Sequence, residues 1–275
     1  MSSRHLVYPP WRAGIATGMV MLLAACGDDI TNNYALEPPT FTPDPIVTHA
    51  QLQEALATAV SSTNGGLDFP MWATVVDRAG VVVAVVASGA AVNDQWLGSR
   101  AISAQKANAA NSFSLDQFSL STANLYSAVQ PGGSLYGLQF SNPVSTDVVY
   151  GGEESQYGTV DDYMVGKKPG GINVFGGGLA LYNSSGVVIG AVGLSGDTSC
   201  ADHNIAWRVR HALGMDFVTA GVAPPIGTNP AGKDNIIFDI TGGVSASGFG
   251  HPTCLNASAD STMGTNLPTT YPLGA

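Results

Sequence analysis

The sequence Met71-Trp-Ala-Thr-Val-Val-Asp77-Arg-Ala-Gly80-Val-Val-Val-Ala-Val-Val-Ala87 contains two Val-rich runs that flank a short polar turn. β-Branched residues favour strands, and a turn that contains glycine lets two strands run antiparallel, so this segment predicts a hairpin. The second run is apolar at every position from 81 to 86. Continuous apolar strands are typical of sheets covered on both faces, so helices are expected on both sides of this hairpin.

Helical and strand patterns continue on both sides of this hairpin. Helices are predicted over residues 48–60, 94–111 and 200–213, a short helix around residues 122–128, and a second hairpin over residues 179–194. In the first helix, Thr48 supplies an N-cap and apolar residues recur at helical spacing. The order of these elements predicts an α+β fold, a three-layer α/β/α domain with an antiparallel sheet of roughly five strands.

The N-terminus predicts export and a lipid anchor. Residues 1–25 place two arginines ahead of an apolar run of about a dozen residues, which is shorter than the roughly 20 that cross a bilayer core. The run ends in Leu23-Ala-Ala-Cys26, which is typical of a lipoprotein signal peptide whose cysteine receives the lipid. Ordinary signal cleavage beside an incidental Cys26 is the alternative. The polar, Pro-rich residues 26–46 are expected to form a tether.

The chain that follows the signal peptide is strongly acidic. Cleavage after residue 25 removes Arg4 and Arg12 and no acid, which leaves eight basic residues against 20 acidic ones. Such a surface repels phosphate backbones, so the sequence argues against a nucleic-acid partner. The expected location is the periplasmic side or the outer surface of a bacterial membrane, with the lipid as the membrane contact.

Two cysteines, Cys200 and Cys254, remain for the folded domain. An even number of thiols in an oxidising compartment predicts a disulfide between them. A zinc site is the alternative, because His203 and His251 stand near these cysteines and two Cys with two His form a zinc ligand set. Residues 215–275 are rich in Gly, Pro, Ser and Thr, and are expected to form an irregular extension that the disulfide pins to the domain.

Four short motifs follow one another along the chain: Val75-Val-Asp-Arg-Ala-Gly80, Ala104-Gln-Lys106-Ala-Asn-Ala-Ala110, Gly170-Gly-Ile172 and Val188-Ile-Gly-Ala-Val-Gly-Leu-Ser-Gly196. Their order resembles that of the GlcG/HbpS-type haem-binding family, which is similar to the C-terminal domain of the propanediol-utilisation adenosyltransferase. The resemblance assigns residues 47–214 to one such domain. It implies a profilin-like sheet, binding of haem or a related tetrapyrrole, and possible homo-oligomer formation. His203 departs from the family pattern, which usually has Glu at this position.

The helix expected over residues 200–213 carries most of the candidate site. His203 and Trp207 share one face of this helix because they are four residues apart. We expect His203 to ligate haem iron, Trp207 to contact the porphyrin, and Arg208, or alternatively Arg210, to pair with a propionate. His211 lies about 12 Å further along the axis, so the two histidines cannot bind one metal together. A packed structural helix with Trp207 in the core is the alternative.

Lys106 is the fourth candidate, because it occupies a motif position of the family and is expected to pair with a ligand carboxylate. An ordinary solvated or ion-paired surface lysine is the alternative interpretation.

Three functions follow from these residues: non-catalytic haem binding for storage, delivery or sensing; an enzyme acting on a small organic acid or cofactor; and a structural or partner-binding lipoprotein. The sequence lacks the motifs of serine hydrolases, zinc proteases and P-loop enzymes, which favours binding over catalysis and leaves enzymatic activity open.

Overall fold

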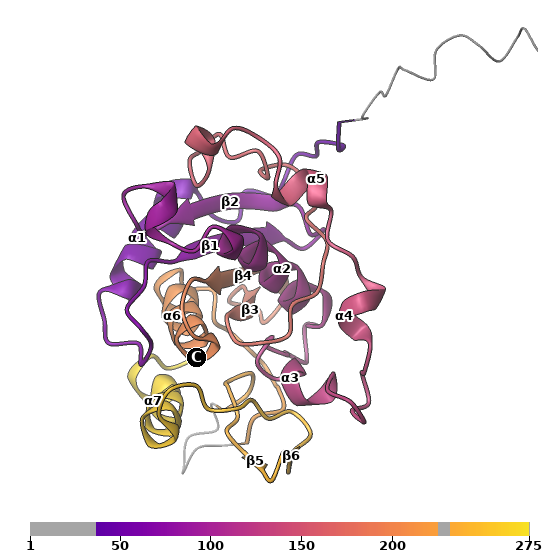
Figure 1. The fold of residues 1–275 in the computed structure, drawn as a ribbon, viewed down its shortest axis with the longest axis vertical. Coiled ribbons are helices and arrows are strands. Elements are labelled where there is room, and N and C mark those ends of the chain that lie inside the picture. The colour runs from indigo at the N-terminus through magenta and orange to yellow at the C-terminus, as the bar shows by residue number, and fades with distance from the viewer. Residues whose placement is uncertain (1–36, 225–231, 275) are drawn as a thin grey trace, which may run out of the picture. The chain divides into compact units, whose positions relative to one another are not determined.

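The computed structural model describes residues 37–224 and 232–274. The predicted signal peptide, the predicted lipid site at Cys26 and most of the predicted tether lie outside the described residues. A compact unit begins at Pro38 and contains every helix and strand of the described chain (Figure 1). None of these helices is long and apolar enough to span a membrane.

A four-stranded antiparallel sheet lies at the centre of this unit. Its strands are β1 (Trp72–Asp77), β2 (Val82–Ala87), β3 (Gly178–Tyr182) and β4 (Val188–Ser195), in the order β2-β1-β4-β3. The two predicted hairpins supply all four strands, and β1 pairs with β4 so that Trp72 stands opposite Ser195. The expectation of roughly five strands is therefore corrected to four in the main sheet.

Short helices and turns occupy the connection between the two hairpins. The short helices are η1 (Val92–Asp94), α3 (Leu125–Ala128), α4 (Leu138–Ser141), α5 (Thr146–Val149) and η2 (Glu154–Gln156). Gly132 and Gly152 both have φ of 86°, a left-handed conformation that interrupts extended backbone. Glycines of this kind interrupt extended backbone in this connection, which adds no strand to the main sheet.

α2 (Gly98–Ser112) covers one face of the sheet at close range. Its alanines pack against apolar side chains of β1 and β2, such as Val76 and Val85. Gly193 of β4 has no side chain to hold the helix away, and a Cβ at this position would lie 2.0 Å from the backbone oxygen of Ser103. Small residues on both surfaces therefore set the distance between this helix and the sheet.

α1 (His49–Val60) and α6 (Ser199–Ala212) cover the opposite face. Thr48 caps α1 as predicted, because its hydroxyl accepts a hydrogen bond from the backbone N–H of Gln51. Leu52 and Leu56 of α1 pack with Ile205 of α6 over the sheet. The resulting order of helix, sheet and helix matches the three layers expected from the sequence.

Both outer strands of the sheet have backbone partners along their outer edges. In β2, the N–H of Val82 donates to the oxygen of Lys167, and the oxygen of Val82 accepts from the N–H of Gly166, both at 2.9 Å. In β3, the N–H of Tyr182 donates to the oxygen of Met215 at 2.8 Å. Backbone groups that a sheet edge would otherwise expose are thus paired at these positions.

The C-terminal segment, described over residues 215–224 and 232–274, contains regular structure. This corrects the expectation of an irregular extension. β5 (Ile240–Thr241) and β6 (Val244–Ser245) form a small second sheet, and α7 (Ala257–Thr270) lies beside α6 (Figure 1). Asn256 caps α7 by accepting the N–H of Ala259 at 3.0 Å. α7 has few apolar residues and contains Pro268. Its sequence therefore shows little helical periodicity, and packing against α6 supplies the missing stabilisation.

Candidate functional site

A disulfide joins Cys200, in the first turn of α6, to Cys254 of the C-terminal segment, as the sequence predicted. The bond closes a loop across 54 residues and holds the C-terminal segment against α6. Because the two sulfurs are bonded to each other, they do not form the alternative zinc site in this structure. His251 nevertheless lies beside them, with its ligand atom and the two sulfurs all within 4.8 Å of one another.

His203, the predicted haem ligand, is fully buried beneath the C-terminal segment. Its Nε2 accepts the backbone N–H of Ile236 at 3.1 Å and lies 3.2 Å from Oδ1 of Asn235. Its Nδ1 has no hydrogen-bond partner among the described residues. Burial lowers the pKa of His203 from 6.5 to about 3, so the ring is neutral at ordinary pH. In this arrangement the C-terminal segment covers the ring.

Lys106 forms an internal ion pair with Asp202 of α6, and both side chains are buried. Its Nζ donates to Oδ2 of Asp202 at 2.6 Å and to the oxygen of Leu194 at 2.9 Å. Burial lowers the pKa of Lys106, which the carboxylate of Asp202 opposes. Burial raises the pKa of Asp202 to about 6, although the ammonium group of Lys106 opposes the shift. Lys106 is thus ion-paired, but it is not a surface residue.

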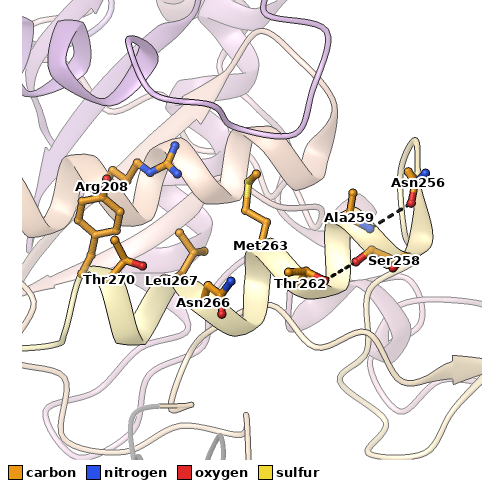
Figure 2. A pocket seen from close by; sticks show the side chains of 10 residues that line it. Arg208, Asn256, Ser258, Ala259, Thr262, Met263, Asn266, Leu267 and Thr270 are labelled. Carbon is orange, nitrogen blue, oxygen red and sulfur yellow. Dashed lines mark hydrogen bonds between the residues drawn. The ribbon is translucent and has the colours of Figure 1, made fainter.

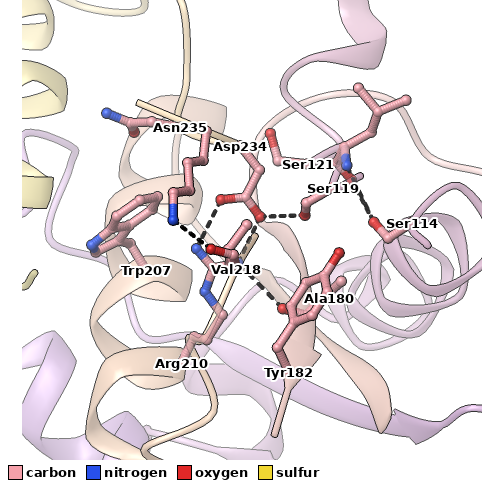
Figure 3. Close-up of polar contacts among 12 residues, drawn as sticks. Ser114, Ser119, Ser121, Ala180, Tyr182, Trp207, Arg210, Val218, Asp234 and Asn235 are labelled. Atoms are coloured by element: carbon pink, nitrogen blue, oxygen red, sulfur yellow. Dashed lines mark hydrogen bonds and ion pairs between the residues drawn. The ribbon is translucent and has the colours of Figure 1, made fainter. Parts of the chain in front are cut away.

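A second buried ion pair links α6 to the C-terminal segment (Figure 3). Arg210 binds Asp234 through two hydrogen bonds, from Nη1 at 2.6 Å and from Nη2 at 2.9 Å. The hydroxyl of Ser119 donates to the same carboxylate at 2.7 Å. Tyr182 stands nearby, and burial raises the pKa of its hydroxyl. Asp234 was not predicted as a site residue, because no motif or spacing connects a single acid in a Gly-rich segment with Arg210.

Trp207 belongs to the core, as the structural alternative for this helix proposed. Its side chain is buried with α1 and the sheet, and its indole N–H donates to the oxygen of Tyr271 at 3.0 Å. Its ring centroid lies 6.3 Å from that of His203. His211 lies at the end of α6, where Nδ1 is 2.8 Å from Oδ2 of Asp216. The predicted helix face therefore brings His203 and Trp207 together and leaves His211 apart from them.

Arg208 lines a groove beside α7 with a volume of about 630 Å³ (Figure 2). The other lining residues are Asn256, Ser258, Ala259, Thr262, Met263, Asn266, Leu267, Thr270 and Tyr271. Nη1 of Arg208 donates to the oxygen of Thr63 at 2.9 Å and to Oδ1 of Asn64, and the guanidinium lies 5.3 Å from the ring centroid of Tyr271. Nε of Arg208 has no hydrogen-bond partner among the described residues. Arg208 is thus separated from the buried positions of His203 and Lys106.

His251, which the sequence places near Cys254 as an alternative zinc ligand, is buried. Its Nδ1 lies 2.7 Å from the oxygen of Pro252, and its Nε2 accepts the N–H of Gly176 at 3.4 Å. Burial lowers its pKa from 6.5 to about 4. The ring is therefore neutral at ordinary pH.

The family model described as haem degrading protein HbpS-like matches residues 47–210 of this chain. Protein ORFY of Klebsiella pneumoniae is a similar solved structure, with 28% sequence identity, a TM-score of 0.40, and coverage of 61% of this chain and 90% of that one. The PduOC:haem complex is another, with 24% identity, a TM-score of 0.41, and coverage of 59% and 89%. No curated protein matches this chain.

Proposed function

This chain belongs to the HbpS-like family, and from that membership we propose that it binds haem or a related tetrapyrrole for storage, delivery or sensing, without catalysis. The proposal includes export, a lipid anchor on Cys26, a profilin-like fold and possible homo-oligomer formation. The N-terminal sequence supports the first two parts, and the motif resemblance supports the others. Residues 26–46 would then be the tether, and residues 47–214 the family domain.

The observation that carries the proposal is the groove at Arg208. Its volume of about 630 Å³ lies within the range of about 300–1,000 Å³ that is typical of ligand sites. Arg208 is a cation at the edge of a groove that also contains the apolar side chains of Met263 and Leu267. An apolar floor beside a guanidinium suits a flat macrocycle with carboxylate substituents.

The residues of the groove fit haem in two further respects. Nη1 of Arg208 donates to Thr63 and to Asn64, which leaves the N–H groups of Nη2 as donors for a propionate. Met263 and Tyr271 line the same groove, and methionine and tyrosine are both known axial ligands of haem iron. When bound, haem supplies an iron atom that can change its oxidation state. Arg208 would hold the propionate, and the ring of Tyr271 would help to exclude water.

His203 remains the predicted axial ligand of a second arrangement. Its Nε2 already accepts a hydrogen bond from Ile236, and the ring is fully buried. Coordination by Nε2 of His203 therefore requires residues 235–236 to move away from α6. The groove at Arg208 requires no such movement, so we propose it as the primary site.

Titration of the purified full chain with micromolar hemin, in detergent, tests the proposal. We expect a Soret band that saturates at one haem per chain, and an Arg208→Gln variant should bind hemin roughly tenfold more weakly, because a hydrogen bond to a charged group is worth about 1.5–3 kcal/mol. The matched control is Lys168→Gln, which removes an exposed cation that does not line the groove. The absence of any Soret change would contradict haem binding.

Axial-ligand variants separate the two arrangements. A changed Soret position in Tyr271→Phe or Met263→Leu supports the groove, whereas a change confined to His203→Ala would contradict it and favour the buried site.

Incubation of the haem complex with ascorbate tests the proposal that the chain binds haem without degrading it. A stable Soret band is expected, and progressive bleaching with release of iron would show degradation instead.

A further inference from the structure

The disulfide and His251 form a compact group of metal-ligating side chains on the C-terminal segment and α6. Within residues 37–224 and 232–274, the sulfurs of Cys200 and Cys254 and one ring nitrogen of His251 all lie within 4.8 Å of one another. Cys200 and His251 are 1% exposed. The group is separate from the groove at Arg208, so it is independent of the proposed haem site.

The hydrogen bonds of His251 prepare one ring nitrogen for a metal. The oxygen of Pro252 lies 2.7 Å from Nδ1 and can only accept, so the proton of the neutral ring is on Nδ1. Nε2 then carries the free electron pair, and its contact with the N–H of Gly176 is long, at 3.4 Å. Metal-binding histidines are commonly oriented in this way, by donation from the second nitrogen to a backbone oxygen.

Two donors from α6 lie beside the sulfur of Cys254. Its sulfur accepts the backbone N–H of Cys200 at 3.1 Å and lies 3.5 Å from the hydroxyl of Ser199. Both donors belong to the first turn of α6, where the unpaired N–H groups of a helix stabilise negative charge. Both donors would remain beside this sulfur when it acts as a metal ligand.

We propose that reduction of the Cys200–Cys254 disulfide creates a zinc site formed by both sulfurs and Nε2 of His251, with a fourth position open to water or a small ligand. A dithiol reductant supplies two electrons and two protons, which convert the disulfide into two thiols while the reductant becomes a cyclic disulfide. Zn²⁺ then replaces both thiol protons and takes the electron pair of Nε2. Two thiolates and one imidazole favour Zn²⁺ over hard cations such as Mg²⁺ and Ca²⁺.

The zinc site couples the redox state of the chain to its C-terminal segment. In the oxidised chain the disulfide joins that segment to α6, and in the reduced chain the metal takes over the same connection. Both forms therefore keep residues 251–254 beside α6, and reduction without a metal removes this connection.

Cobalt titration of the reduced full chain tests this site, with Cys26→Ser introduced to remove the third thiol. After reduction and removal of the dithiol without oxygen, one Co²⁺ per chain should bind with a thiolate-to-cobalt charge-transfer band and the visible bands of tetrahedral coordination. Zn²⁺ should displace the cobalt and remove both signals. The oxidised chain should bind no Co²⁺ in this way.

Variants and X-ray absorption identify the ligands. His251→Ala should weaken Co²⁺ binding roughly tenfold or more, and the matched control His211→Ala should not. X-ray absorption at the zinc edge of the reduced, zinc-bound chain should show two sulfurs and at least one nitrogen bound to zinc. This measurement does not depend on the folding of any variant. Equal Co²⁺ affinity in reduced wild-type and Cys200→Ser/Cys254→Ser chains would overturn the proposal, as would a zinc shell without sulfur.

Discussion

Ile236 donates its backbone N–H to Nε2 of His203 at 3.1 Å, across a separation of 33 residues in the sequence. This bond joins the C-terminal segment to α6 at the residue that the sequence analysis proposed as a haem ligand. It places the ring in the interior, where its protonation state depends on folding. The energetic consequences of this burial can be measured.

Acidification from pH 7 to pH 4 should destabilise the fold. Burial lowers the pKa of His203 to about 3 and that of His251 to about 4, from 6.5 for each, so unfolding lets both rings take up protons below pH 6.5. The unfolded state then binds more protons, and stability falls as the pH falls. Asp202 acts in the opposite direction between pH 6 and 3.8, because burial raises its pKa to about 6, and it offsets one of the two rings.

Urea unfolding at pH 7, 6, 5 and 4 measures this dependence. His203→Asn should be less stable than wild type at pH 7 and should lose less stability on acidification, because one of the two titrating rings is gone. His211→Asn is the matched control, since this ring is 37% exposed at the end of α6. Stability that rises between pH 6 and 4 in the wild-type chain would contradict the burial of both rings.

Removal of the disulfide should destabilise the chain substantially. For a loop of this size, with a sequence separation of 54 between Cys200 and Cys254, the chain-entropy model gives about 4 kcal/mol. Cys200→Ser/Cys254→Ser should show this loss in urea unfolding under metal-free conditions. Proteolysis should then cut residues 232–274 faster than the core of the domain. Cys26→Ser serves as the control for removal of a thiol, and equal stability of both variants would argue against the bond.

Breaking the buried pair of Arg210 and Asp234 should cost about 3–5 kcal/mol in either single variant, because the remaining charge has no partner in the interior. Asp234→Asn and Arg210→Met are suitable changes. The double variant Arg210→Met/Asp234→Asn should lose less than the sum of the two, because no buried charge remains. A double-mutant cycle from urea unfolding measures the coupling, and additive losses would show that the pair is not coupled.

Lys106→Met should be most damaging in alkaline solution. At pH 8 the carboxylate of Asp202 remains buried without its cation, and we expect a loss of about 3–5 kcal/mol. At pH 5 the same carboxyl is protonated, because burial already raises its pKa to about 6 in the presence of Lys106. The loss should therefore be smaller at pH 5. Urea unfolding of Lys106→Met at pH 8 and pH 5 measures this difference in stability loss, with Lys168→Met at an exposed position as the control. An equal loss at both pH values would contradict the prediction.

The elements of the layered domain were predictable because their signals are local. The Val-rich runs of the first hairpin, the cap at Thr48 and the Ala-rich residues of α2 each report on neighbours within a few positions. α7 was missed because it has little apolar periodicity and depends on contact with α6. The strand count was too high because glycines at positive φ interrupt the connection between the hairpins.

In the candidate site too, features with a local sequence signal were predictable, and features that depend on distant contacts were not. Counting cysteines predicted the partner of Cys200, since two thiols allow one intramolecular pairing. The partner of Lys106 is 96 residues away, and that of Arg210 is 24 residues away in a segment without a motif. Burial of His203 depends on the path of a Gly-rich segment, which no helical or strand pattern specifies. Local sequence therefore identified reactive side chains but not their accessibility.

The paired outer edges of the sheet matter for a domain that, as proposed, is held on a membrane by a lipid. Molecules confined to a surface meet one another far more often than in dilute solution, and always in similar orientations. An unpaired strand edge under these conditions would be a template for association between neighbouring copies. Pairing of Val82 with residues 166–167, and of Tyr182 with Met215, occupies those templates within each molecule. These backbone groups are therefore not available for pairing with a neighbouring copy.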